Sequence, residues 1–183
     1  MSAYGQGSEK SKEDIEEFWN ELSECVGSFG RNEPVVVLGD LNTRVGNEVI
    51  EGIVGRHGEP GRNKSGERLL EMCAEQELVV GNSWFKKNVY KHTWVRMAEG
   101  RVVDKALMDY VLLPRRMFGK LLDVKVWTVE RGDCRPFLVE ARLKLVGGWR
   151  SAGRMEGVRN VLKVSELNDS VKEKAYQESL RGK

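Results

Sequence analysis

The chain is poor in the residues and segments that mark secreted, disulfide-bonded and membrane-spanning proteins. Only three of its 183 residues are cysteines, and Cys25, Cys73 and Cys134 lie far apart. An odd number at such spacing argues against a disulfide framework or a zinc site and favours a reducing compartment. No apolar run is long enough to span a membrane, and the first residues lack the pattern of a secretory signal. We therefore expect an intracellular protein, nuclear or cytoplasmic, with no membrane partner.

The two signs of charge are nearly balanced, so composition alone does not indicate a nucleic-acid-binding protein. Lys and Arg total 30 and Asp and Glu total 28, a formal net charge of +2. Acidic residues dominate up to Glu33, and basic residues dominate in 56–64, in 86–101 and after residue 144. With 40% hydrophobic and 32% charged residues, we expect one globular domain over residues 1–146. Residues 147–183 are predicted to be a basic linker or tail, partly helical or disordered.

The most informative stretch is an apolar run that ends in polar residues. Residues 34–38 read Pro-Val-Val-Val-Leu, which predicts a short strand buried on both faces. Gly39 permits a tight turn, and Asp40 and Asn42 follow it. If the chain stays extended, these two side chains point to the same side. Residues that do chemistry often lie where a buried strand ends, but Asp and Asn are equally typical of an ordinary polar turn.

Two helices and several strands are predicted around this stretch. The first helix covers residues 11–27, with Ser11 as its cap and Asp14 completing a capping box. The second covers residues 65–76 and turns Leu69, Leu70 and Cys73 inward. Strands are expected at 78–80, 93–95, 107–113, 121–129 and 137–146, with a hairpin turn at 97–101 built on Gly100. We expect Trp84, Phe85 and Trp94 to pack in the core rather than to stack on bases.

The segment 45–65 is rich in glycine and is expected to be a long binding or mobile loop. Its basic side chains suit phosphate contact, namely Arg44, Arg56, Arg62 and Lys64. His57 is expected to be an exposed loop histidine rather than a catalytic residue.

Asp109 is predicted to lie in the middle of an apolar strand, Ala106-Leu107-Met108-Asp109-Tyr110-Val111-Leu112. An ionised side chain there is costly unless it is paired or hydrogen-bonded. Asp109 is therefore either a site residue or a residue that holds a neighbour in place.

Four short motifs occur in an order typical of one superfamily. They are Gly39-Asp40-Leu41-Asn42, Thr93-Trp94, Asp109-Tyr110-Val111-Leu112 and Gly132-Asp133-Cys134-Arg135-Pro136. In these motifs the chain resembles the endonuclease/exonuclease/phosphatase superfamily, in particular the apurinic-type endonuclease domain of non-LTR (LINE-like) retrotransposons. It is also similar to the craniofacial development protein 2-like proteins. The resemblance covers residues 2–146.

This resemblance implies a fold, a reaction and a set of site residues. The fold is an α/β four-layer sandwich with two mainly antiparallel sheets face to face and helices outside. The reaction is hydrolysis of a phosphodiester, with DNA as the partner and Mg²⁺, or Mn²⁺, as the cofactor. It implies that Asp40 activates water, that Asn42 and Tyr4 contact the phosphate, and that Asp109 orients the family's histidine. Asp133, together with Asp40, is implied to bind the metal.

Two departures from the family pattern bear on activity. The family's histidine position is occupied by Cys134, and a neutral thiol supplies no positive charge to a phosphate. His92 is not expected to substitute for it. The resemblance begins near the family's catalytic tyrosine, so we expect only the C-terminal portion of the sandwich, without the N-terminal half.

Three functional interpretations follow. The first is a retroelement-derived endonuclease-type domain with impaired catalysis. The second is an active Mg²⁺-dependent nuclease. The third is a non-enzymatic module that binds nucleic acid or a protein partner through its basic segments.

Overall fold

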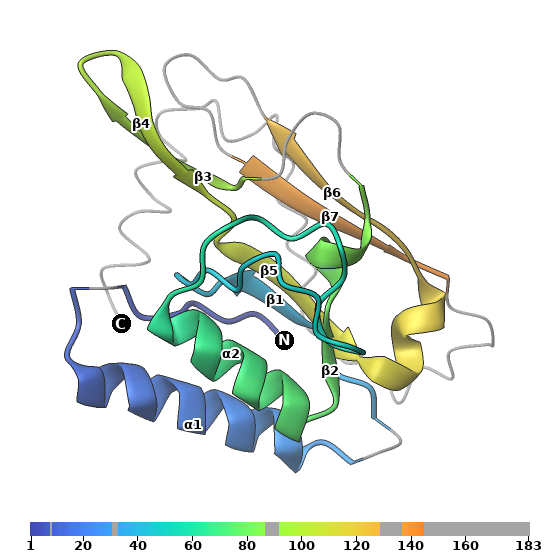
Figure 1. Cartoon of the computed structure of the whole chain (residues 1–183). Helices are drawn as coiled ribbons and strands as arrows, with labels where there is room; N and C mark the ends of the chain where they lie inside the picture. Colours follow the sequence, from blue (N-terminus) through green and yellow to red (C-terminus); the bar gives the residue numbers. More distant parts are fainter. Residues whose placement is uncertain (8, 31–32, 87–91, 129–136, 145–183) are drawn as a thin grey trace, which may run out of the picture. The chain divides into compact units, whose positions relative to one another are not determined.

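The computed structural model describes residues 1–7, 9–30, 33–86, 92–128 and 137–144, and these contain two α-helices, two short 3-10 helices and three antiparallel sheets (Figure 1). The central sheet has the strand order β1-β5-β2, built from β1 (Val37–Asp40), β5 (Asp109–Pro114) and β2 (Leu78–Val80). The other two sheets are the hairpin β3 (Trp94–Ala98) with β4 (Arg101–Ala106) and the pair β6 (Leu121–Thr128) with β7 (Phe137–Leu143). The expected tail, residues 147–183, lies outside the described residues.

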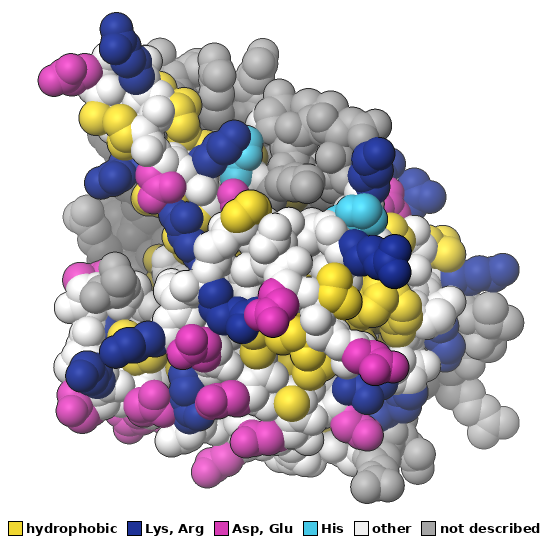
Figure 2. Space-filling view, in the orientation of Figure 1, with side chains coloured by type: hydrophobic (Ala, Val, Ile, Leu, Met, Phe, Trp, Pro, Cys, Tyr) yellow, Lys and Arg dark blue, Asp and Glu magenta, His cyan; other side chains and the backbone are white. Residues whose placement is uncertain are grey.

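Both predicted helices are confirmed. Helix α1 (Lys12–Ser28) begins with the predicted capping box between Ser11 and Asp14 and buries Trp19, Leu22 and Val26. Its exposed face is acidic, and Figure 2 shows Asp and Glu side chains gathered along the edge of the molecule where α1 lies. Helix α2 (Lys64–Glu75) is capped by Asn63, whose side chain accepts a hydrogen bond from the Gly66 N–H. Leu69, Leu70 and Cys73 are buried, as the sequence predicts.

The central sheet is covered on both faces. On one face Tyr110 and Leu112 of β5 pack with Val37 and with the buried sides of both helices. On the other face Val111 and Leu113 pack with Met117, Leu121 and Val124, which belong to the 3-10 helix η2 (Arg115–Lys120) and to β6. Because successive residues of β5 point to opposite faces, one strand contributes to two apolar clusters. This arrangement of helices and antiparallel sheets is the predicted α/β class.

Four details of the sequence prediction are wrong. The first strand begins at Val37, and it is not buried on both faces, because Leu38 is 45% exposed. Asp109 is the first residue of β5 rather than its middle. The segment 45–65 is not a loop throughout, because α2 begins at Lys64, and its loop part places Ile53 and Val54 in the core. Trp94 is 37% exposed and is not a core residue.

The β3–β4 hairpin projects from the rest of the fold (Figure 1). Its turn is the predicted one, with Glu99 and Gly100 both at positive φ, 51° and 73°. Strand β4 was not anticipated from the sequence, because its apolar residues Val102 and Val103 are exposed rather than alternating toward a core.

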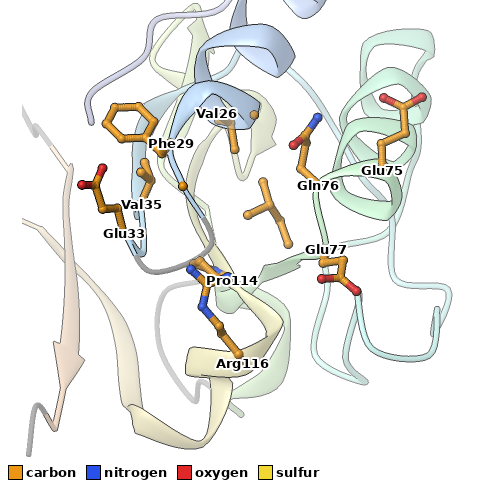
Figure 3. Close-up of a pocket in the computed structure, with 12 residues that line it drawn as sticks. Val26, Phe29, Glu33, Val35, Glu75, Gln76, Glu77, Pro114 and Arg116 are labelled. Carbon is orange, nitrogen blue, oxygen red and sulfur yellow. The ribbon is translucent and has the colours of Figure 1, made fainter.

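A pocket of about 290 Å³ lies where the central sheet meets the ends of both helices (Figure 3). Pro114 of β5 and Leu78 of β2 form part of its lining. Among the described residues, no helix is long and apolar enough to cross a membrane.

Candidate active site

Asp40 and Asp109 lie directly opposite each other at the end of the central sheet. Strands β1 and β5 pair antiparallel, and their register places Asp40 against Asp109. The pairing continues past the strand end, where the Leu41 N–H donates to the Met108 carbonyl oxygen at 2.8 Å. Side chains at such a position lie on the same face, with Cβ atoms about 4.5–5.5 Å apart. Two carboxylates that are far apart in the sequence thus form one acidic pair.

Tyr4 is brought to this pair by the N-terminal segment, which runs beside β1. The N–H groups of Ala3 and Gly5 donate to the carbonyl oxygens of Leu38 and Asp40, at 3.0 and 2.7 Å. Tyr4 lies between these two contacts, and its side chain is 73% exposed. Gly39 allows the close approach, because a Cβ atom there would overlap the Ala3 carbonyl oxygen. The role of Gly39 is therefore to admit a neighbouring segment, not to make the predicted turn.

Asn42 also reaches this corner, but not in the extended conformation that spacing suggested. Its φ is 47°, so the backbone turns at Asn42 itself. The Asn42 N–H donates to Asp40 Oδ1 at 2.9 Å, which orients that carboxylate. The Asn42 side-chain amide donates to the Gly5 carbonyl oxygen at 2.8 Å, which ties the N-terminal segment to the end of β1. These hydrogen bonds connect Asn42 to Asp40 directly and to the segment that carries Tyr4 through Gly5.

Two further residues, neither of them among the predicted site residues, hold Asp109. Thr93 is buried, and its hydroxyl oxygen accepts hydrogen bonds from the Met108 and Asp109 N–H groups, both at 3.0 Å. Asn82 lies just after β2, and its side-chain amide continues the hydrogen bonding of β2 with β5. The amide donates to the Asp109 carbonyl oxygen at 3.1 Å and accepts from the Val111 N–H at 2.8 Å. The sequence does contain a pattern that points to Asn82, because it comes two residues after the end of a buried strand, as Asn42 does.

The position of Asp109 perturbs its protonation. Burial raises the pKa of Asp109 above its ordinary value, a hydrogen bond from Thr93 opposes this, and the negative charge of Asp40 raises the pKa further. The pair therefore has a smaller tendency to carry two negative charges than two exposed carboxylates would have.

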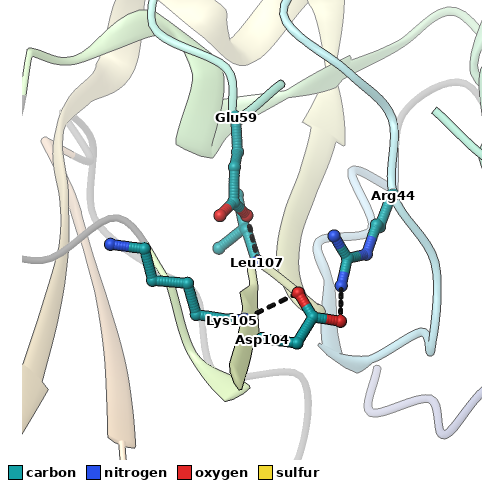
Figure 4. Close-up of polar contacts among 5 residues, drawn as sticks. All are labelled: Arg44, Glu59, Asp104, Lys105 and Leu107. Atoms are coloured by element: carbon teal, nitrogen blue, oxygen red, sulfur yellow. Dashed lines mark hydrogen bonds and ion pairs between the residues drawn. The ribbon is translucent and has the colours of Figure 1, made fainter. Parts of the chain in front are cut away.

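A second polar cluster joins Arg44 and Glu59 to strand β4 and to Leu107, which follows it (Figure 4). Arg44 Nη2 contacts Asp104 Oδ2 at 2.8 Å, and this hydrogen bond lowers the pKa of the Asp104 carboxyl group. The Glu59 carboxylate accepts a hydrogen bond from the Leu107 N–H, next to Asp104 and Lys105. Burial raises the pKa of Glu59, although that hydrogen bond and the charges of Arg44 and Lys105 oppose the shift. The cluster anchors the base of the β3–β4 hairpin close to Asp109.

The basic residues expected to contact phosphate are only partly available. Arg44 is paired with Asp104, and Arg62 pairs with Glu48 at 3.1 Å. Arg56 and Lys64 are exposed. His57 is partly buried, and its backbone N–H donates to the Ser83 carbonyl oxygen at 2.8 Å.

Asp133 and Cys134, the remaining predicted site residues, lie outside the described residues. Within the part of the chain that the structure describes, no group of three or more His, Cys, Asp and Glu side chains is arranged to hold a metal ion. The Asp40–Asp109 pair nevertheless offers the oxygen ligands that Mg²⁺ prefers, and Mg²⁺ commonly uses one or two carboxylates with water and substrate phosphate.

Comparisons with known proteins agree with this architecture. No family model matches the chain. The chain is similar to craniofacial development protein 2 of Bos taurus and of Tragulus javanicus, at 28% identity over 137 residues in each case. The match covers 72% of this chain but only 22% and 23% of these relatives.

Two solved structures share the fold. The endonuclease domain of TRAS1, a telomere-specific non-LTR retrotransposon, matches with a TM-score of 0.53 at 14% identity, over 79% of this chain and 57% of that domain. The 3'-5' exonuclease NExo from Neisseria meningitidis matches with a TM-score of 0.55 at 18% identity, over 77% and 60%. The chain has an endonuclease/exonuclease/phosphatase-like fold. It spans less than two thirds of either solved chain, as expected for a portion of the four-layer sandwich.

Proposed function

We propose that the chain is a retroelement-derived, Mg²⁺-dependent phosphodiester-hydrolase type domain, intracellular and acting on DNA, whose catalysis is impaired. The observation that carries this proposal is the convergence of Asp40, Asn42, Tyr4 and Asp109 at one end of the central sheet. Phosphoryl transfer requires a positioned nucleophile and groups that contact the phosphate oxygens. A carboxylate pair beside an exposed phenol and a carboxamide supplies both kinds of group.

Each residue takes a role that its contacts support. Asp40 accepts a proton from, or orients, the attacking water, and the Asn42 N–H fixes that carboxylate. Tyr4 donates to a phosphate oxygen from its exposed position. Asp109 is held by Thr93 and Asn82, which suits a positioning role. Asp40, with Asp133, would hold Mg²⁺ or Mn²⁺, which neutralises phosphate charge and lowers the pKa of bound water.

Impairment rests on the absence of a cationic imidazole at the expected position. Cys134 stands there, and a neutral thiol does not stabilise charge on a phosphate. His92 does not compensate in this proposal, because burial and the Lys105 charge lower its pKa and so disfavour the cationic imidazole. Loss of such a group costs on the order of 10²–10⁴ in rate.

A second candidate function is DNA binding without cleavage. The projecting β3–β4 hairpin carries exposed Arg96, Arg101 and Lys105 beside exposed Trp94 and Met97. Figure 2 shows Lys and Arg side chains around an apolar patch on this hairpin. If the three basic residues contact phosphates, replacing them with Gln reduces the slope of log K against log[salt] by up to about 3.

One experiment separates these functions. Nicking of supercoiled and abasic-site DNA in Mg²⁺ is compared for the chain, for Cys134→His, and for Cys134→His combined with Asp40→Asn, and DNA binding is measured on the same samples. We expect Cys134→His to nick at least about 100-fold faster than the chain, and Asp40→Asn to abolish that gain. Measurable nicking by the chain at the same rate as by Cys134→His would refute impairment. Salt-dependent binding without nicking by any variant would favour the binding module.

A further inference from the structure

The pocket at the opposite end of the central sheet has the features of a binding site. Its lining comes from the C-terminal ends of α1 and α2, the start of β2 and the end of β5. Its volume of about 290 Å³ is large enough for an amino-acid side chain with part of its backbone. Pro114 and Asp109 are the two ends of β5, so this pocket lies roughly 17 Å from the candidate active site at about 3.4 Å per residue. The two sites are therefore separate.

The walls of the pocket are apolar where they meet the core. Val26, Leu78 and Pro114 are buried residues that form its inner surface. Phe29 caps the C-terminus of α1 and is 42% exposed, so part of its surface is open to solvent. In Figure 3, Phe29 and Val35 lie on one side of the pocket and Gln76 and Glu77 lie on the other. A ligand with a flat or aliphatic part can pack between these sides.

The rim of the pocket is negatively charged. Glu33, Glu75 and Glu77 line it, and Arg116 is the one basic residue among its described lining residues. Among the described residues, none of these three carboxylates forms an ion pair. Both helices end at the pocket, and neither has a basic residue in its last turn. The partial negative charge of two helix C-termini therefore adds to that of the carboxylates and is not offset within either helix.

We propose that this pocket binds an arginine side chain, flanked by apolar residues, of a partner protein. A guanidinium group is planar and can lie against the Phe29 ring while its N–H groups bind carboxylates on the rim. The apolar walls accept the aliphatic stem of the arginine and a neighbouring apolar side chain. An anionic ligand is disfavoured by three carboxylates and two helix C-termini, and a purely apolar ligand would leave the charged rim without a partner.

The test uses the peptide acetyl-Leu-Arg-Leu-amide titrated into the ¹⁵N-labelled full chain, followed by NMR. We expect saturable shifts of the Gln76, Glu77 and Leu78 amide signals, with a Kd on the order of 1 mM. The same peptide with Gln in place of Arg serves as the neutral comparison and is expected to bind at least about 10-fold more weakly, since charge-assisted hydrogen bonds are lost.

Variants of the protein locate the binding site. Glu33→Gln with Glu77→Gln removes carboxylates from opposite sides of the pocket and is expected to weaken binding about 10-fold. Glu17→Gln with Glu21→Gln makes the same change of net charge on the exposed face of α1 and should leave the Kd unchanged. The proposal is overturned if the arginine and glutamine peptides bind alike, if shifts do not saturate, or if both pairs of substitutions weaken binding equally.

Discussion

The β3–β4 hairpin leads directly into β5, and the two regions are stabilised in different ways. Tyr110 to Leu113 of β5 are each at most 2% exposed, whereas Met97, Val102 and Val103 of the hairpin are at least 50% exposed. Burial stabilises β5, because burying each large apolar side chain contributes about 1.5–3 kcal/mol to the free energy of folding. The hairpin depends on its two-residue turn, its own ladder, and the contacts of Asp104 and Leu107 at its base. A free hairpin of two strands is only marginally stable, so these basal contacts decide whether it holds its position.

The most direct test of this contrast compares one apolar side chain from each region. Leu112→Ala in β5 removes a fully buried side chain and should lower the free energy of unfolding by about 2–5 kcal/mol. Val103→Ala in the hairpin should change it by no more than about 0.5 kcal/mol. Urea unfolding followed by circular dichroism measures both. Similar losses in the two variants would show that the hairpin is buried in solution.

Gly39 tests the close packing of the N-terminal segment against β1. Gly39→Ala should lower the free energy of unfolding by about 1–3 kcal/mol, because the added methyl group displaces the Ala3 carbonyl oxygen. Hydrogen exchange should also become faster at the Ala3 and Gly5 amides, which now bond to β1. Gly119→Ala is the matched control, since a Cβ there has no heavy atom within 4 Å. A Gly39→Ala protein with unchanged exchange at both amides would contradict this account.

Glu59 tests the junction between the two regions. Glu59→Ala leaves the buried Leu107 N–H without its acceptor and should cost about 1–3 kcal/mol. Glu59→Gln keeps an acceptor oxygen and should cost less. If the Glu59–Leu107 hydrogen bond acts mainly on the hairpin, hydrogen exchange at the β3 and β4 amides should become faster in Glu59→Ala under conditions where the protein is still folded. Equal stability of the Ala and Gln variants would show that this hydrogen bond contributes little.

The same contrast explains which features the sequence predicts. The helices are set by nearby residues, since Ser11 with Asp14 and the spacing of Trp19 and Leu22 determine α1 locally. The strands of the core follow from apolar runs such as Leu78–Val80. Strand β4 does not, because Val102 and Val103 have no core to alternate toward. Its existence depends on the turn and on pairing with β3.

The candidate site is less predictable because distant segments define it. The polar residues after Val37–Leu38 are visible in the sequence, but their arrangement is not. Asn42 turns because its amide reaches Gly5, and Asp109 begins β5 because Asn82 continues the ladder beside it. The need for glycine at position 39 comes from Ala3, which is distant in sequence. Each of these depends on a contact between segments more than 20 residues apart.

Asp109 marks the boundary between the two regions, and its charge gives the smallest expected effect. The folded protein raises the pKa of Asp109 through burial and the nearby Asp40 charge, so the ionised form opposes folding. Below the unfolded pKa, about 3.9, both states are protonated and there is no cost. As the pH rises toward the folded pKa, the folded state binds more protons than the unfolded state, and stability falls. Above the folded pKa the cost is constant.

Asp109→Asn removes this cost while keeping the shape of the side chain. We expect the variant to be more stable than the parent at pH 7, by up to about 1 kcal/mol, and equally stable near pH 4. Urea unfolding across this pH range measures the difference, and Asp123→Asn on β6 serves as a control for a carboxylate outside the pair. If the Asn variant is less stable at pH 7, the Asp109 carboxylate is stabilised by a contact that outweighs its burial, such as a cation held between it and Asp40. Adding EDTA to the parent protein would then lower its stability at pH 7 and leave the Asn variant unchanged.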